Sequence, residues 1–248
     1  WYWGDTPGIH ADARPDIAAR KDLFTILYGG TPLIWRERPG YGWDRRRSRL
    51  LQTVHDTTPW HAAVGFEELL DHAFLSQDMV LQRTRFTGGY TATINFANEP
   101  RTCADASGNE VTLAPCGFLA EGPGILHARL WQDGEVFTRT EKEGFCRLLT
   151  VSRRQIGPVN VDGEFTAFRV SPDHWQGVVE ASGTTVVDLV ELTGCPAPLV
   201  VYDLDGVGTP RSLCDVENPN AFRLTTKGAR LFFAVVPQDV ADPVSAYP

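Results

Sequence analysis

The sequence has no uninterrupted run of about 18 apolar residues, the length that a helix needs to cross a bilayer, so it predicts no membrane span. It is also poor in positive charge, because 23 Lys and Arg stand against 31 Asp and Glu, for a net charge of −8. This balance argues against nucleic acid as the main partner. The single basic cluster, residues 45–47 with Arg49, indicates a solvated or acid-paired helix face.

Cysteine is scarce, with five residues at wide spacing and no C-x-x-C pair. This pattern favours buried free thiols over a disulfide framework or a zinc site, although one disulfide remains an alternative. The six histidines never recur at the spacing of metal ligands on a helix face. We therefore predict neither a metal site nor a cofactor.

Familiar catalytic signatures are absent from the sequence as well: it has no G-x-S-x-G elbow, no P-loop and no dinucleotide fingerprint. The segment 203–214 begins like a calcium loop, with Asp203, Asp205 and Gly208, but its twelfth position is Cys214 where a glutamate is expected. A turn is the better interpretation. Asp71 and His72 are neighbours, and we interpret them as structural.

Three helices are predicted in the first part of the chain. The first begins at Pro15 and ends at the glycines 29–30, and the second is capped by Asp44. The third is predicted from Phe66 to Phe74, where apolar residues recur at helical spacing.

After Asp78 the hydrophobic period falls to two, which predicts strands. Gly88 and Gly89 join the first two strands in a hairpin. Many short strands follow, separated by turn residues, and they predict an antiparallel β-sandwich. We therefore predict a mainly β chain in two parts, helical elements in 1–77 and a sandwich in 78–248.

The start of the chain, "WYWGDTPG", is dense in aromatic residues. It does not resemble the end of a signal peptide, so we expect either a cut precursor or, preferably, a sequence that begins inside a larger protein. Aromatic faces and a carboxylate commonly bind sugars, and Trp3 and Asp5 are the candidates for substrate binding. Large core or rim residues are the alternative interpretation of these tryptophans, and without further information it is the favoured one.

Four phrases, "WYWGD", "ARKDLFTILYGGTPLIW", "LDHAFLSQDMVLQRTRFTGGYTATINFANEP" and "LAPCGFLAEG", occur in this order. In this order they resemble the later part of glycoside hydrolases of families 101 and 129, the α-N-acetylgalactosaminidases of mucin-type O-glycans and their relatives. The resemblance extends from Trp1 to about Gly122. It implies a carbohydrate partner and helical elements that form the end of a (β/α)₈ barrel before the sandwich.

The resemblance also implies that the catalytic carboxylates lie on earlier barrel strands, outside this chain. A retaining mechanism needs two carboxyl groups roughly 5–5.5 Å apart, and no such pair can be assigned from this sequence. We therefore expect the parent protein to be a glycoside hydrolase and this chain to be inactive alone. The alternatives are a non-enzymatic carbohydrate-binding or scaffolding sandwich and, third, an independent hydrolase.

Overall fold

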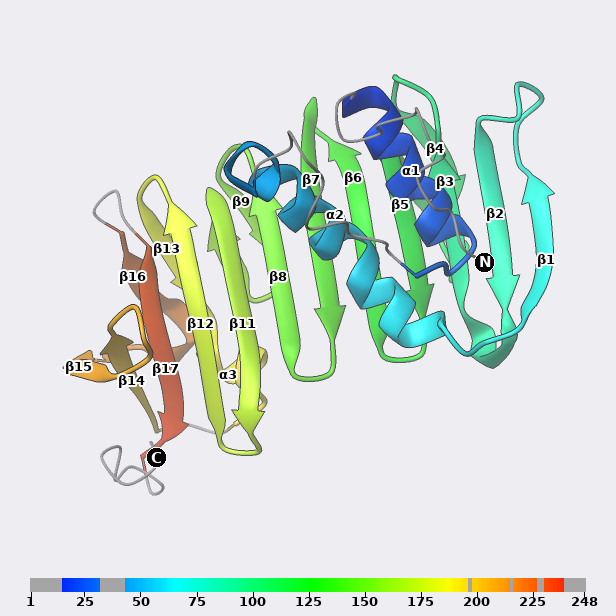
Figure 1. Cartoon of the computed structure of the whole chain (residues 1–248). Helices are drawn as coiled ribbons and strands as arrows, with labels where there is room; N and C mark the ends of the chain where they lie inside the picture. Colours follow the sequence, from blue (N-terminus) through cyan, green and yellow to red (C-terminus); the bar gives the residue numbers. More distant parts are fainter. Residues whose placement is uncertain (1–14, 32–42, 196–197, 215, 227–229, 239–248) are drawn as a thin grey trace. The chain divides into compact units, whose positions relative to one another are not determined.

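The computed structural model describes residues 15–31, 43–195, 198–214, 216–226 and 230–238, with the side chains of 15–18 and 43–46 left aside. The chain forms two compact units, residues 1–136 and 137–248. Each is described by itself. In both units the strands pair antiparallel, so the prediction of a mainly β, antiparallel chain is confirmed (Figure 1).

The first unit holds two long helices and an antiparallel sheet. The helices are α1 (Pro15–Leu27) and α2 (Trp43–Val64). The sheet runs in the order β1-β2-β3-β5-β6, and β4 pairs with β5. Its strands are β1 (Leu69–Phe74), β2 (Leu81–Phe86), β3 (Thr91–Asn95), β4 (Arg101–Ala104), β5 (Glu110–Gly122) and β6 (Ile125–Gln132).

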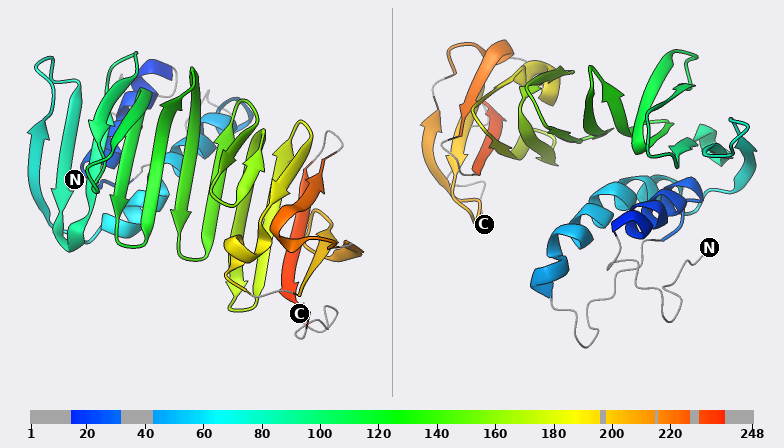
Figure 2. Two further views of the ribbon diagram at one scale, coloured as in Figure 1. Left: turned by 180° about the vertical axis from the view of Figure 1, so that it is seen from behind. Right: turned by 90° about the horizontal axis from the view of Figure 1, so that it is seen from above.

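Both helices lie on one face of this sheet, as the view from above shows (Figure 2). Their apolar residues and those of β2, β3, β5 and β6 form one buried core. Trp60 is fully buried in it, and its indole N–H donates to the carbonyl oxygen of Ile26 at 2.8 Å. The rings of Phe86 and Tyr90 both lie edge-on to this tryptophan, with centroids 6.0 Å away. The core therefore fixes the two helices to each other and to the sheet.

The two helices predicted at the start of the chain are confirmed, but Asp44 does not cap the second one, because α2 begins at Trp43 and contains Asp44. Gly29 follows α1 in the left-handed conformation, with φ 63°, as expected of a glycine that ends a helix. The hairpin of β2 and β3 is confirmed too. Its connection is a short 3-10 segment, Thr87–Gly89, in place of the expected two-residue primed turn. Gly88 and Gly89 both have positive φ.

The third predicted helix is wrong. Its residues form strand β1, which pairs antiparallel with β2 over Leu69–Phe74. The supposed apolar stripe is not buried, because Phe66 is fully exposed and Leu70 and Phe74 are 59% and 54% exposed. The spacing of the apolar residues fits a helix, but pairing with β2 supplies the backbone hydrogen bonds that an isolated short helix would have to form alone.

The second unit contains two antiparallel sheets and is sandwich-like. The larger has the order β7-β8-β11-β12-β17-β14-β15 and the smaller β16-β13-β10-β9. The strands of the larger sheet are β7 (Glu135–Lys142), β8 (Phe145–Thr150), β11 (Gly163–Ser171), β12 (His174–Ala181), β14 (Leu199–Leu204), β15 (Pro210–Cys214) and β17 (Leu231–Pro237). Those of the smaller are β9 (Arg154–Ile156), β10 (Val159–Val161), β13 (Thr184–Val187) and β16 (Phe222–Thr225).

A short helix, α3 (Leu189–Thr193), follows β13. The side chain of Asp188 caps its first turn by accepting from the Glu191 N–H, and Gly194 ends it in the left-handed conformation. The strand β13 therefore ends at Val187, directly before this helix. The helix changes the direction of the chain between the small sheet and β14.

Candidate functional site

The predicted sugar-binding residues Trp3 and Asp5 lie outside the described residues, so their role stays a prediction. Among the residues that are described, two regions gather charged side chains in a setting that could form a site. One is a pair of acids between the helices and the sheet of the first unit. The other is a cleft in the second unit.

Asp22 of α1 and Asp56 of α2 are the buried acids of the first unit, 5% and 2% exposed. Arg49 approaches Asp22 to 2.5 Å, and the Thr53 hydroxyl donates to the same carboxylate at 3.2 Å. Burial raises the pKa of Asp22 above its ordinary value of 3.8, Arg49 opposes the rise, and the negative charge of Asp56 adds to it. The negative charges of the two acids therefore repel each other across the interface of the helices.

Asp56 joins α2 to strand β6. Its carboxylate accepts from Arg129 at 2.6 Å and from the Gln52 amide at 2.7 Å. Its backbone carbonyl lies 2.7 Å from Nε2 of the fully buried His127. Each buried acid thus has an arginine partner of its own. Such an arrangement holds elements together, whereas an acid–base pair for catalysis would have to face a substrate.

The cleft of the second unit has a volume of about 400 Å³ and lies between the large sheet and the end of α3. Its lining includes Arg139 and Glu141 of β7, Phe145 of β8, Trp175 of β12 and Gly194. Arg139 holds Glu141 with two hydrogen bonds, of 2.6 and 2.7 Å, and both side chains are about one-third exposed. These polar groups are fixed, paired and reachable from solvent.

Aromatic side chains and an unreactive thiol line this cleft. Trp175 is 6% exposed, and its indole nitrogen is buried without a hydrogen-bond partner among the described residues. Lys142 lies over the Phe145 ring, 5.5 Å from its centroid. Burial raises the pKa of the Cys146 thiol, also in the lining, to about 12, so this thiol is not a nucleophile at neutral pH. The cleft therefore places a fixed ion pair beside aromatic surface.

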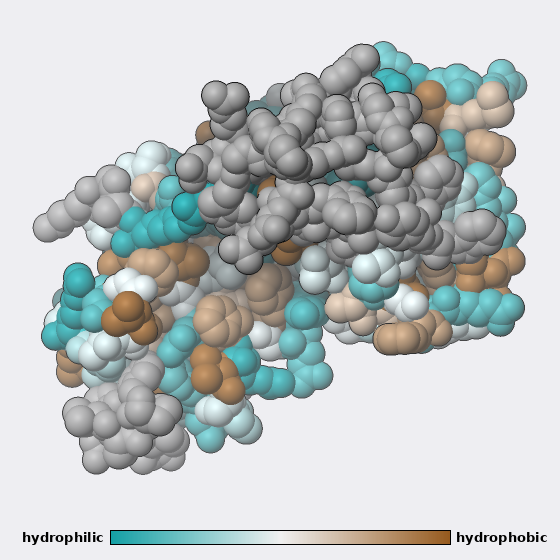
Figure 3. All heavy atoms as spheres, viewed as in Figure 1, coloured by the Kyte–Doolittle hydropathy of each residue, from teal (hydrophilic) through white to brown (hydrophobic). Residues whose placement is uncertain are grey.

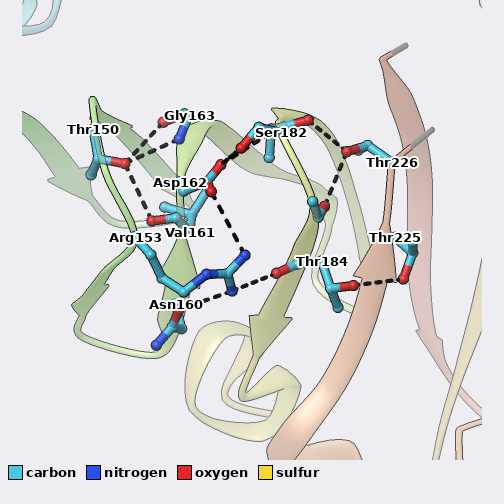
Figure 4. Close-up of polar contacts among 12 residues, drawn as sticks. Thr150, Arg153, Asn160, Val161, Asp162, Gly163, Ser182, Thr184, Thr225 and Thr226 are labelled. Carbon is cyan, nitrogen blue, oxygen red and sulfur yellow. Dashed lines mark hydrogen bonds and ion pairs between the residues drawn. The ribbon is translucent and has the colours of Figure 1, made fainter. Parts of the chain in front are cut away.

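A network of polar contacts in the second unit lies where the chain passes from one sheet to the other, among them the β10–β11 and β12–β13 connections (Figure 4). Asp162 links β10 to β11, and its carboxylate accepts from the Ser182 hydroxyl at 2.5 Å and from its N–H at 3.0 Å. Ser182 follows β12, where the chain passes from the larger sheet to β13 of the smaller one. Arg153 donates to the Thr184 carbonyl at 2.7 Å, and the Thr226 hydroxyl donates to that of Ala181 at 2.7 Å. The network closes the corner between the sheets, and we assign it a structural role.

Three interpretations from the sequence can be compared with the structure. Asp205 begins a turn, and its side chain accepts from the N–H groups of Val207 and Thr209 at 2.9 Å each, as predicted. Asp71 pairs with Arg85, whereas His72 contacts Gln82, so these two neighbours serve different partners on β2. All five cysteines are free thiols, as predicted, but Cys146 alone is buried and the other four are partly exposed.

The residues of the cleft were not singled out in the sequence. The segment "RTE" of β7 does place Arg139 and Glu141 on one face of a strand, and this alternation is the available signal. Trp175 carries no such signal, because one tryptophan within a strand looks like any other core residue. Within the described residues, no group of three or more His, Cys, Asp or Glu side chains could hold a metal ion. No described helix is long and apolar enough to span a membrane.

Comparisons with known proteins found no match to this chain, whether among protein-family models, curated proteins or solved structures.

Proposed function

We propose that this chain is the C-terminal portion of a glycosidase that resembles the enzymes hydrolysing α-N-acetylgalactosaminyl linkages of mucin-type O-glycans, with the catalytic carboxylates on another part of the protein. The order of the four phrases between Trp1 and Gly122 supports it. In this proposal, α1 and α2 are the last helices of a (β/α)₈ barrel and rest on the first sheet of a supporting β domain.

The observation that supports the proposal is that both buried acids are paired with arginines. Asp22 and Asp56 each have an arginine at 2.5–2.6 Å, and their side chains are 7% and 3% exposed. Asp22 joins α1 to α2 and Asp56 joins α2 to the sheet, so acids engaged in this way stabilise the packing of the helices. They do not resemble the two open carboxyl groups of a glycosidase.

The second candidate is a non-enzymatic carbohydrate-binding protein, and the cleft of the second unit favours it. A fixed arginine–glutamate pair can donate to and accept from neighbouring sugar hydroxyls, and Phe145 and Trp175 supply aromatic surface beside it. In this proposal the second unit binds a glycan by itself and needs no other part of the protein.

Hydrolysis is tested with p-nitrophenyl α-N-acetylgalactosaminide and the whole chain. We expect no release of p-nitrophenol above that of a heat-inactivated sample. Release that disappears in Asp5→Asn would instead make the chain a hydrolase that uses its own acids. The intact mass of the native polypeptide in its source tests the same proposal independently, since a glycosidase must carry an acid pair and the described residues offer none.

Binding separates the two candidates. Titration of the whole chain with methyl α-N-acetylgalactosaminide, followed by NMR, is repeated with Asp5→Asn and with Arg139→Gln. Weakened binding in Asp5→Asn alone favours the glycosidase, because Asp5 belongs to its expected sugar site. Weakened binding in Arg139→Gln alone favours the carbohydrate-binding protein. Arg230→Gln is the matched control, since Arg230 pairs with Glu180 at an exposed position of the same unit.

A further inference from the structure

Strand β1 forms an edge of the sheet in the first unit. In the part of the chain that the structure describes, its one neighbour is β2, and the other side pairs with no strand. Natural sheets usually protect such an edge with lysine, proline or a bulge. β1 has a bulge between Leu69 and Asp71, and from Asp71 to Phe74 its pairing with β2 is regular. The regular stretch carries neither lysine nor proline.

The backbone of this stretch offers hydrogen-bonding groups at its outer side. The N–H of Leu75 donates to the Leu81 carbonyl at 2.7 Å, and Ala73 is opposite Arg83 in the same register. Antiparallel strands direct the groups of alternate residues toward and away from a given neighbour. Ala73 and Leu75 therefore face β2, and His72 and Phe74 direct their N–H and C=O groups outward.

The side chains of β1 are unusually apolar for an exposed edge. Phe74 is 54% exposed and Leu75 42%. The His72 ring lies between those of Phe74 and Tyr28, at centroid distances of 5.0 and 5.7 Å, and its Nε2 is 3.0 Å from Gln82. Hydrophobic and hydrophilic residues alternate along the margin where β1 lies (Figure 3). The edge thus combines backbone groups for pairing with ring surface for packing.

We propose that β1 pairs with β1 of a second copy of this chain, antiparallel and with Ala73 opposite Ala73. A two-fold axis normal to the sheet requires opposite residues to lie on the same face, and this register meets the requirement. It places His72 opposite Phe74 of the other copy, so the outward groups of both residues form hydrogen bonds. It also brings small alanines to the axis and avoids the bulge.

Charge is compatible with this register. Asp71 is opposite Leu75 of the other copy, so the two aspartates are not neighbours, and each already pairs with Arg85 of its own chain at 3.2 Å. A register centred on Asp71 would place two like charges opposite each other, which is destabilising. The short strand gives a small interface, so we expect a weak dimer that dissociates on dilution below about 100 µM.

The first test is a disulfide at the axis. Residues opposite each other in a non-hydrogen-bonded antiparallel pair have Cα atoms roughly 4.5 Å apart, within the range of a disulfide. Mild oxidation of Ala73→Cys should therefore give a covalent dimer. Asp71→Cys is the control at the same edge, because its copies are too far apart to bridge. The unchanged chain controls for its five native thiols.

The second test removes the outward donor. In His72→Pro the N–H of residue 72 is lost without affecting a bond to β2, since an edge strand tolerates proline at an outward N–H. His72→Ala loses the same ring and keeps the N–H. We expect the dimer dissociation constant from sedimentation to rise at least about tenfold more in His72→Pro than in His72→Ala. A chain that stays monomeric at about 1 mM, or equal cross-linking of Ala73→Cys and Asp71→Cys, overturns the proposal.

Discussion

Asp56 of α2 and Arg129 of β6 form an ion pair of 2.6 Å in which the aspartate side chain is 3% exposed. The arginine also lies over the Phe118 ring, 5.4 Å from its centroid. The ion pair connects the helical layer to the sheet, and the ring contact joins β6 to β5 within the sheet. The ion pair contributes to stability only when both partners are present, because a buried charge without its partner is strongly destabilising.

Arg129→Met should lower the free energy of unfolding of the first unit by about 3–5 kcal/mol, since it leaves Asp56 buried without its cation. The double variant Asp56→Leu with Arg129→Met should be less destabilised than Arg129→Met alone, because it leaves neither charge. Denaturation in urea measures both. The control Arg230→Met breaks an exposed pair and should cost less than about 1 kcal/mol. Equal losses in the two arginine variants would contradict the role assigned to Asp56.

Acidification should act in opposite directions at Asp22 and Asp162. The pKa of Asp22 is raised by burial, so this group contributes most to stability below its unfolded value of about 3.8 and loses that contribution as the pH rises through its folded value. The pKa of Asp162 is lowered by the Ser182 hydroxyl, so its contribution is present above about 3.8 and is lost as the pH falls through its folded value.

Urea denaturation between about pH 3 and pH 7 tests this difference. Relative to the unchanged chain, Asp22→Asn should become more stable as the pH rises, because the unchanged chain then holds a charged acid in a buried position. Asp162→Asn should become less stable over the same range. Parallel pH profiles for the two variants would show that one of the two directions is wrong.

Trp60 provides a prediction for the core of the first unit. Trp60→Phe keeps most of the apolar volume but removes the hydrogen bond to the Ile26 carbonyl, so we expect a loss of about 1–3 kcal/mol. Trp60→Ala should lose more, about 3–5 kcal/mol, because a cavity forms at a fully buried site. Phe66→Ala is the control, since the Phe66 ring is fully exposed and should change stability by less than about 0.5 kcal/mol.

The parts of the fold that follow from local chemistry were predicted from the sequence. Gly29 ends α1, and the glycines at 88 and 89 turn β2 into β3, because backbone conformations with positive φ favour glycine whatever the rest of the chain does. β1 could not be predicted in this way. The spacing of its apolar residues fits a helix, but pairing with β2, which no local pattern shows, makes it a strand.

The candidate sites depend even more on contacts between residues that are distant in the sequence. Asp56 and Arg129 are 73 residues apart, and no local pattern relates an acid on a helix to an arginine on the fifth strand of a sheet. The cleft brings β7 together with β12 and α3, so its members become neighbours through the sheet topology alone. The sequence could suggest which residue types bind sugars but not that Trp175 and Glu141 share a cleft.

Two glycines of the second unit differ in what a methyl group would meet. A Cβ at Gly177 of β12 would come within 2.6 Å of the Thr166 carbonyl oxygen and would collide with the Phe233 ring, whereas at Gly206 it would meet nothing within 4 Å. Phe233 stacks on Phe165, with ring centroids 5.9 Å apart, so it has little freedom to move. Gly177→Ala should therefore lower the free energy of unfolding by at least about 1–3 kcal/mol, and Gly206→Ala should leave it within about 0.5 kcal/mol. Thermal denaturation of the two variants beside the unchanged chain measures the difference, and equal midpoints would mean that β12 and β17 pack less closely than the structure has them.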